Sequence, residues 1–320
     1  MKLRWRLEVG LASAVFRFFG LWSGAGRIMC GRLFGFLGRI LVAKVRKRTR
    51  ANLRIAFPEA SEARIDQLMR DAYCSIAKGS YDFYWSGRWT KEEVESRIQW
   101  EPESLKSFES AYRAGKGIVL VVGHLGNWEF VSHAIMLRGM QLNAYAAIQV
   151  NTLANEMVEK IRKRFGAKFF APRMMNSPDM LRCLKKGEIA GFVADQNAGS
   201  RGFFVPFMGQ LASTHKGPAS YAALSGSEAF FGVGLDQGQG VYRIEMIPLG
   251  RCGRSESEIL AFTARWVDIL EKYIRMYPEQ YFWMHNRWKS RPGPDSIIVE
   301  RAKSDLQPRE KNAVGVERKP

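Results

Sequence analysis

Several features that would place this chain in a common class are missing. Its four cysteines, at positions 30, 74, 183 and 252, show neither paired nor metal-binding spacing. A disulfide framework is therefore not expected, and reduced thiols in a cytosol-facing protein are the simplest interpretation. The sequence also contains no internal repeat, no P-loop and no dinucleotide-binding fingerprint. These absences leave no motif that predicts a nucleotide-dependent enzyme.

Acidic residues are too few to balance the basic ones. Lys and Arg number 49 and Asp and Glu 31, so the net charge is 49 − 31 = +18. Such a charge concentrates anionic partners: nucleic acid, an anionic membrane face, phosphorylated lipid or an acidic carrier protein. The length of 320 residues and the 46% hydrophobic content predict one large domain with appendages.

Long apolar runs are also lacking. Residues 9–43 are rich in Phe, Leu, Trp, Ile and Gly, but arginines interrupt them, and the longest uncharged stretch is residues 18–26. A membrane-spanning helix needs about 20 mostly apolar residues, and an arginine at its centre costs roughly 2.5–3.5 kcal/mol. No small-residue cleavage site follows a compact apolar core, so a signal peptide is not predicted.

The same segment has an amphipathic pattern. At about 100° per residue, Arg17, Arg32, Arg39 and Arg46 share one side, with Arg27 displaced from it. Five glycines share the arginine side, where they would permit close backbone contact: Gly20, Gly24, Gly31, Gly35 and Gly38. The opposite side gathers Phe18, Phe19, Trp22, Met29, Leu33, Phe36, Leu37 and Ile40. The pattern predicts a helix in the membrane interface, with packing on the protein's own core as the alternative.

The run at residues 44–50 is strongly basic. It is typical of a juxtamembrane collar that binds anionic lipid. A solvated stretch of charge is the alternative interpretation.

Helical and strand patterns alternate through the middle of the chain. This alternation predicts an α/β fold with a central mixed sheet flanked by helices and preceded by an amphipathic or membrane-anchoring helix. We predict three regions: a membrane-associating segment at 1–43, a main domain at 44–298 and a disordered charged tail at 299–320. Predicted helices are 61–79, 90–114, 127–138, 151–166, 177–186, 216–226 and 256–276; predicted strands are 117–123, 144–149, 168–170, 189–194, 229–235 and 241–247.

One histidine and one carboxylate follow the apolar strand at 117–123. They are His124 and Glu129. A carboxylate that fixes the imidazole tautomer leaves the other ring nitrogen free to accept a proton. The pair can meet if His124 lies on the turn and Glu129 on the first turn of the next helix. No serine or cysteine lies between them, so the proton would come from a substrate hydroxyl, and the reaction would be direct group transfer.

The string Gly123-His-Leu-Gly-Asn-Trp-Glu-Phe130 resembles the lipid A biosynthesis acyltransferases, a group similar to the His-x4-Asp/Glu lysophospholipid acyltransferases. Further blocks follow the family's order: Arg50–Glu59, Arg164–Gly166, Asp195-Gln196, Val205–Gly209, Thr214–Ala219 and Trp283–Lys289. The resemblance extends over about residues 45–295. Asn286 and Trp288 depart from it, because a basic residue and Phe are commoner there.

The resemblance implies transfer of a fatty acyl chain from acyl carrier protein to a hydroxyl of Kdo-modified lipid IVA at the cytoplasmic face of the bacterial inner membrane. His124 would be the base and Glu129 its orienting partner. Backbone amides near Gly123–Asn127, helped by Arg164, would stabilise the oxyanion. No cofactor and no metal are expected, and the spacing of His124, Glu129 and His133 is not that of a zinc motif.

Other candidate substrate contacts are Asn127, Asp195, Gln196, His285 and Arg287. Asp195 and Gln196 end a predicted strand, where α/β proteins place their sites, although Asp195 would be equally suited to capping the strand end. Arg164 is equally suited to the negative end of its helix. His285 and Arg287 lie among tryptophans that suit a glycolipid headgroup or packing onto the core.

Two other functions remain open. One is acylation of another lipid, such as phosphatidylinositol mannoside, from coenzyme A. The other is non-enzymatic binding of membrane or nucleic acid, which would explain the charge. That alternative leaves the His124 and Glu129 pattern unexplained, and the sequence carries no nucleic-acid-binding motif, so no nucleic-acid partner is expected.

Overall fold

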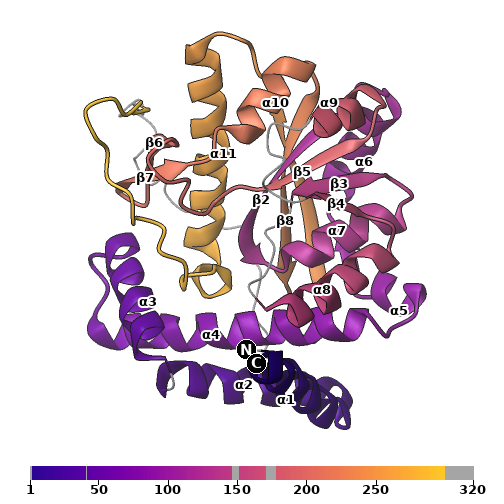
Figure 1. Ribbon diagram of the computed structural model, residues 1–320, viewed down its shortest axis with the longest axis vertical. Helices are drawn as coiled ribbons and strands as arrows, with labels where there is room; N and C mark the ends of the chain where they lie inside the picture. The colour runs from indigo at the N-terminus through magenta and orange to yellow at the C-terminus, as the bar shows by residue number, and fades with distance from the viewer. Residues whose placement is uncertain (1, 41, 146–150, 171–177, 300–320) are drawn as a thin grey trace.

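A central seven-stranded sheet organises the chain, with helices on both of its faces (Figure 1). The computed structural model describes residues 2–40, 42–145, 151–170 and 178–299. The strand order is β1-β9-β8-β2-β5-β3-β4, and β8 and β9 are the antiparallel pair in an otherwise parallel sheet. The predicted mixed sheet flanked by helices is confirmed. Its strands are β1 (Ile98–Trp100), β2 (Ile118–Gly126), β3 (Leu142–Tyr145), β4 (Lys168–Phe170), β5 (Ile189–Val193), β8 (Glu228–Asp236) and β9 (Tyr242–Gly250).

The central strand β2 is buried on both faces. Side chains alternate along a strand, so Val119 and Val121 enter one core while Leu120 and Val122 enter the other. A parallel strand covered on both sides reads as a continuous apolar run rather than an alternating one. The helices around the sheet are α4 (Glu62–Ser86), α5 (Lys91–Glu95), α6 (Pro102–Arg113), α7 (Trp128–Leu137), α8 (Thr152–Arg164), α9 (Pro178–Lys185), α10 (Gly217–Ser225) and α11 (Glu256–Met276).

The prediction of one helix over residues 90–114 is wrong. The segment divides into α5, β1 and α6, with a capping box at Thr90 and Pro102 in the first turn of α6. Proline suits a helix start but not its interior, so residue 102 marks the division. The sequence analysis also missed the hairpin of β6 (Phe203–Phe207) and β7 (Gln210–Thr214).

Two predictions extend beyond the described residues. The strand expected at 144–149 corresponds to β3, which ends at Tyr145, and residues 146–150 are not described. The disordered tail predicted at 299–320 lies outside the described residues except for Val299.

The N-terminal segment is a helical hairpin rather than one helix. It comprises α1 (Lys2–Gly20) and α2 (Ser23–Ile40), and it leads to α3 (Ala43–Ala56). The hairpin packs beneath α4, which lies between it and most of the sheet (Figure 1). Close packing requires small residues here, because a Cβ on Gly31 would come within 2.7 Å of Cγ of Lys78. Gly20, Gly31 and Gly35 of the predicted glycine side therefore face α4, whereas a Cβ on Gly24 would meet nothing within 4 Å.

Arg27 joins the hairpin to α4 and to the sheet through hydrogen bonds. Its Nε donates to Oδ2 of Asp82 at 2.5 Å, and its Nη2 donates to Oδ2 of Asp236 at 2.7 Å and to the Tyr242 hydroxyl at 3.4 Å. Arg27 and Asp82 are fully buried. Losing one partner of such a cluster would cost about 3–5 kcal/mol, because a buried charge would remain uncompensated. Arg27 therefore contacts protein rather than lipid headgroups.

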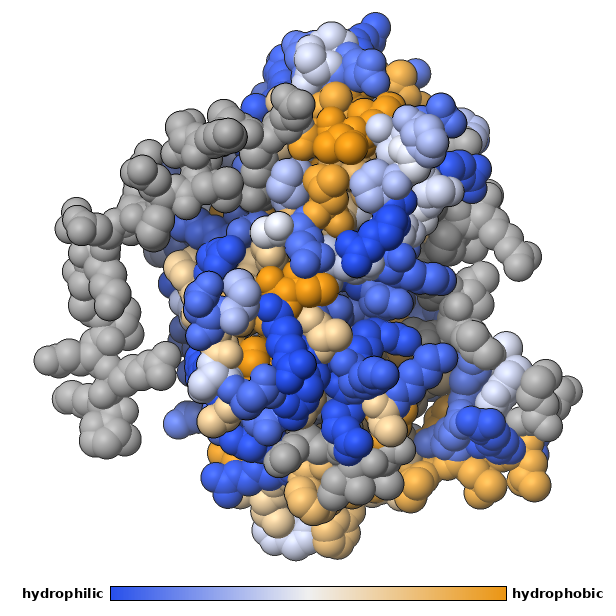
Figure 2. All heavy atoms as spheres, turned by 90° about the vertical axis from the view of Figure 1, so that its left-hand side faces the viewer, coloured by the Kyte–Doolittle hydropathy of each residue, from blue (hydrophilic) through white to orange (hydrophobic). Residues whose placement is uncertain are grey.

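The outer side of the hairpin exposes large apolar side chains: Leu3, Leu7, Leu11, Phe18, Trp22, Ile28, Met29, Leu33 and Phe36. Figure 2 shows hydrophobic residues along the lower edge of the molecule, below a broad hydrophilic band. We call the nine exposed apolar side chains of the hairpin named above the apolar face. Contiguous exposed apolar surface marks an interaction site in most soluble proteins. In the described ranges, no helix is both long and apolar enough to cross a membrane.

Candidate functional site

His124 lies inside strand β2, two residues before its end, and not on the turn that the sequence predicts. The turn comes at Gly126, where φ is +61° and a Cβ would come within 2.1 Å of the Gly234 carbonyl oxygen. Only glycine fits this backbone at so close an approach. The amide of Asn127 then donates to the same carbonyl at 2.7 Å. Helix α7 starts at the next residue, with Glu129 in its first turn as predicted.

The carboxylate that contacts His124 belongs to Asp195, not to Glu129. Oδ1 of Asp195 lies 2.6 Å from Nδ1 of His124, and Oδ2 accepts from the His124 amide at 3.0 Å. The parallel pairing of β2 with β5 explains this contact, because Asp195 follows β5 at the same edge of the sheet. The predicted contact of Glu129 with His124 is thus replaced by one from a residue 71 positions away.

The charge state of Asp195 fixes the imidazole tautomer. Burial favours a higher pKa, but the charge of His124 and hydrogen bonds from its ring and amide prevail and lower the pKa of Asp195 to about 2. An ionised carboxylate only accepts hydrogen bonds, so Nδ1 of His124 carries the proton. In the neutral form of the ring, Nε2 has the free lone pair, and the side-chain nitrogen of Gln196 lies 3.2 Å from it. This is the arrangement of a general base with an orienting partner.

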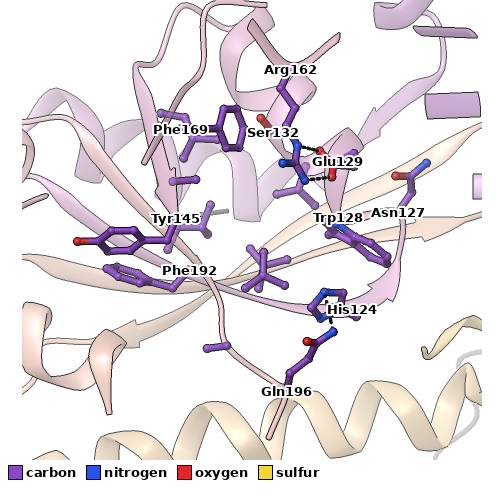
Figure 3. A pocket seen from close by; sticks show the side chains of 18 of the residues that line it. His124, Asn127, Trp128, Glu129, Ser132, Tyr145, Arg162, Phe169, Phe192 and Gln196 are labelled. Atoms are coloured by element: carbon purple, nitrogen blue, oxygen red, sulfur yellow. Dashed lines mark hydrogen bonds and ion pairs between the residues drawn. The ribbon is translucent and has the colours of Figure 1, made fainter. Parts of the chain in front are cut away.

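Glu129 is held by Arg162. The guanidinium meets the carboxylate at two points, with Nε 3.0 Å from Oε2 and Nη2 2.5 Å from Oε1. Figure 3 shows this pair and the His124–Gln196 pair at separate places around one cavity. Arg162 was not among the site residues predicted from the sequence. Its i, i+4 spacing from the apolar Val158 places both on one face of α8, but this spacing alone does not distinguish a site residue from a solvated cation.

The cavity has a volume of about 560 Å³, within the range of small-molecule pockets. His124, Asn127, Glu129, Arg162 and Gln196 supply polar groups to its wall. Most of the remaining lining is apolar and comes from β2, β3, β5, α8 and their neighbours: Leu120, Val122, Leu142, Ala144, Tyr145, Val158, Phe169, Phe192 and Val193. The cavity therefore joins a proton-accepting group to space suited to a hydrocarbon chain.

Two backbone amides expected to stabilise an oxyanion are already engaged. The amide of His124 donates to Asp195 and that of Asn127 to Gly234. The side chain of Asn127 lines the cavity but donates to the Gly79 carbonyl at 3.3 Å. An anion in the cavity would need other donors, and Arg162 is a cation in its lining.

Asp195, whose carboxylate contacts His124, and three further predicted contact residues lie outside the cavity lining. Arg164 donates to the Ser86 carbonyl at 2.9 Å. His285 accepts from the Asn197 amide at 3.1 Å, and burial lowers its pKa to about 4, so its ring is neutral. Arg287 is fully buried and donates to the Ser213 carbonyl and to Oγ1 of Thr214. All three contact protein groups that surround the site.

His133 belongs to the core. It lies near the rings of Phe83 and Phe165, and its Nε2 is 3.0 Å from Oγ of Ser86. Burial lowers its pKa to about 3. Across the described ranges, no three His, Cys, Asp or Glu side chains gather into a candidate metal site.

The chain is similar to proteins of known activity over most of its length. It is 27% identical over 278 residues to a lipid A biosynthesis lauroyltransferase of Escherichia coli, which covers 83% of this chain and 85% of that protein. A lipid A biosynthesis palmitoleoyltransferase of the same organism is 24% identical over 283 residues, with 85% and 89% covered. A myristoyltransferase is 22% identical over 214 residues, with 62% and 64% covered. The family profile described as bacterial lipid A biosynthesis acyltransferase matches residues 5–290. The chain therefore belongs to the bacterial lipid A biosynthesis acyltransferase family.

Proposed function

We propose that this acyltransferase moves a fatty acyl chain from acyl carrier protein to a hydroxyl of Kdo-lipid IVA. The single observation that carries the proposal is the contact of His124 with Asp195 beside an apolar cavity, in a chain of this family. A thioester donor and a hydroxyl acceptor need no redox chemistry, so the scheme uses neither a cofactor nor a metal.

In the proposed mechanism, the acceptor hydroxyl replaces the amide of Gln196 at Nε2 of His124. His124 takes its proton as the oxygen attacks the thioester carbonyl, and Asp195 stabilises the imidazolium that forms. The tetrahedral intermediate then collapses, the carbon–sulfur bond breaks, and the proton returns to the departing thiolate. The ester and the free carrier thiol are the products.

Arg162 is the group we propose for the oxyanion. Among the described residues of the cavity lining it is the one guanidinium, whereas Arg164 is directed to the Ser86 carbonyl. Preorganised positive charge at a developing oxyanion contributes strongly to catalysis in a water-poor site. Glu129 would hold Arg162 in place through its two contacts. Glu129 would thus be essential through Arg162 rather than through His124.

We also propose that the protein binds peripherally to the cytoplasmic face of the bacterial inner membrane. The apolar face would enter the lipid interface, and the basic α3 would meet anionic headgroups. This position brings the cavity to a membrane-embedded acceptor. The net charge of +18 would also attract the acidic carrier protein.

A donor and acceptor screen tests the proposal. Thioester consumption by the purified protein is measured with acyl carrier protein or coenzyme A thioesters, and with Kdo-lipid IVA or phosphatidylinositol mannoside. Transfer to Kdo-lipid IVA from the carrier thioester is expected, and lipid A from cells lacking the protein should lose one acyl chain by mass spectrometry. Transfer only to another lipid would reject the acceptor. Salt-sensitive DNA binding without thioester consumption would reject the enzyme function.

A further inference from the structure

A largely buried segment near the C-terminal end of the described chain contacts His124 and the loop after Asp195. We call residues 281–287 the strap. Its Phe282 amide donates to the His124 carbonyl at 2.9 Å, and its Tyr281 forms an antiparallel bridge with Leu125. Its His285 ring accepts from the amide of Asn197, two residues after Asp195. The strap therefore contacts both chain segments that form the base.

Helix α3 binds the strap through side chains of two successive turns. Nδ2 of Asn52 donates to the carbonyls of Trp283 at 2.8 Å and His285 at 2.6 Å. Nη1 of Arg48 donates to the Met284 carbonyl, which lies between them, at 3.3 Å. Three consecutive strap carbonyls are thus bound by one helix. Asn52 is 4% exposed, and both hydrogens of its amide are used.

We propose that Asn52 is a positioning residue for the transfer reaction. It clamps the strap, and the strap holds the backbone of His124 and the loop that carries Asp195 and Gln196. The inference rests on the proposed function, because it assumes that His124 is the base. It adds a role for α3, the helix that links the apolar hairpin to the main domain.

The rate of the transfer reaction is expected to depend on how firmly the backbone of His124 is held. A displacement of about 1 Å at a catalytic group can cost about 10²-fold in rate. Without the amide of Asn52, the Trp283 carbonyl loses this hydrogen bond and the His285 carbonyl keeps the one from the Arg287 amide, so the strap is held less firmly. A residue that served stability alone would lower the melting temperature but leave kcat of the folded enzyme unchanged.

The test compares Asn52→Leu with Thr49→Val. Leu is close to Asn in shape but donates no hydrogen bond. Thr49 is a matched control, because it is also buried on α3 and its Oγ1 bonds to the Val45 carbonyl at 3.0 Å and the Tyr73 hydroxyl at 3.2 Å rather than to the strap. Melting temperature, kcat and KM for the acyl carrier thioester, and hydrogen exchange of the strap amides are measured on the same samples.

We expect Asn52→Leu to lower kcat at least about tenfold, to change KM for the thioester less than about twofold, and to speed exchange at the strap. Thr49→Val should lower the melting temperature and keep kcat within about twofold of wild type. Folded Asn52→Leu with wild-type kcat and strap exchange would overturn the proposal. An equal kcat loss in Thr49→Val would do the same.

A second variant covers the case in which Asn52→Leu does not fold. Arg48→Met removes one strap contact from a partly exposed position, so folding should survive. Faster strap exchange and a kcat reduced about twofold to fivefold are expected, and wild-type values of both would overturn the clamp. If the wild-type protein consumes no thioester, the proposed function fails, while the exchange comparison still tests the clamp.

Discussion

At the scale of single residues, the site depends on which nitrogen of the His124 ring carries the proton. Asp195 holds Nδ1 of His124, and Nε2 remains a proton acceptor. We expect His124→Ala to lower kcat by about 10²–10⁴, the usual contribution of a general base. Asp195→Asn should lower kcat by a comparable factor, because an amide can present a donor to Nδ1 and favour the wrong tautomer.

Thioester consumption and thermal unfolding of these two variants are measured together. Wild-type melting with reduced turnover supports a role in the reaction. Near-normal turnover by His124→Ala would eliminate the mechanism. A melting loss that accounts for all lost activity in Asp195→Asn would leave this carboxylate only a structural role.

Because His133 is buried, we expect the stability of the folded protein to fall in acid. Its pKa is about 3 in the folded chain and 6.5 when exposed, so the unfolded chain takes up a proton first as the pH falls. The contribution of neutral His133 to the free energy of unfolding is present above pH 6.5 and is lost as the pH falls below it. The loss is about 2 kcal/mol between pH 7 and pH 5. The variant His133→Phe keeps an aromatic ring and should lack this loss. Unfolding by denaturant at the two pH values measures it; equal losses in both proteins would contradict the assignment.

At the scale of elements, the lining strands set the length of the cavity. Ala144 of β3 lines it among larger apolar side chains. We expect Ala144→Leu to shorten the accessible space and shift preference toward shorter chains. Burying two methylenes contributes about 1.6 kcal/mol of binding free energy. The ratio of kcat/KM between two thioesters that differ by two methylenes should therefore change by about tenfold in the variant. An unchanged ratio in a folded variant would place the acyl chain elsewhere.

At the scale of the whole molecule, the apolar face and the basic helix α3 belong to consecutive parts of the chain. The hairpin exposes its apolar face, and α3 continues from it with a basic sequence. We expect the double variant Phe18→Ser and Phe36→Ser to weaken binding to anionic vesicles about tenfold or more, because burying each large apolar side chain contributes about 1.5–3 kcal/mol.

Vesicle sedimentation measures this binding, and thioester consumption with a detergent-dispersed acceptor controls for folding. Both phenylalanines are exposed, so the core should be little affected. The interfacial role would be abandoned if the double variant bound vesicles as wild type does.

The sequence alone determined the local units of this protein. The apolar run before His124 predicted β2, and Glu129 was correctly placed in the first turn of the following helix. The shared side of Gly31 and Gly35 on α2 was likewise predicted by helical periodicity, and a Cβ on either would come within 3.3 Å of α4. Such features depend on neighbours within a few residues, and the side chains themselves encode them.

Only the tertiary structure decided which of these units meet. The contact of Asp195 with His124 needs the pairing of β2 with β5, and the contacts of Asn52 join α3 to the strap across more than 200 positions. The choice of Arg162 over Arg164 depends on how α8 is rotated against the cavity. Strand order and helix packing arise from the burial of whole faces, which no short pattern specifies. The sequence therefore predicted His124 as a candidate base, and the fold determined which carboxylate contacts it.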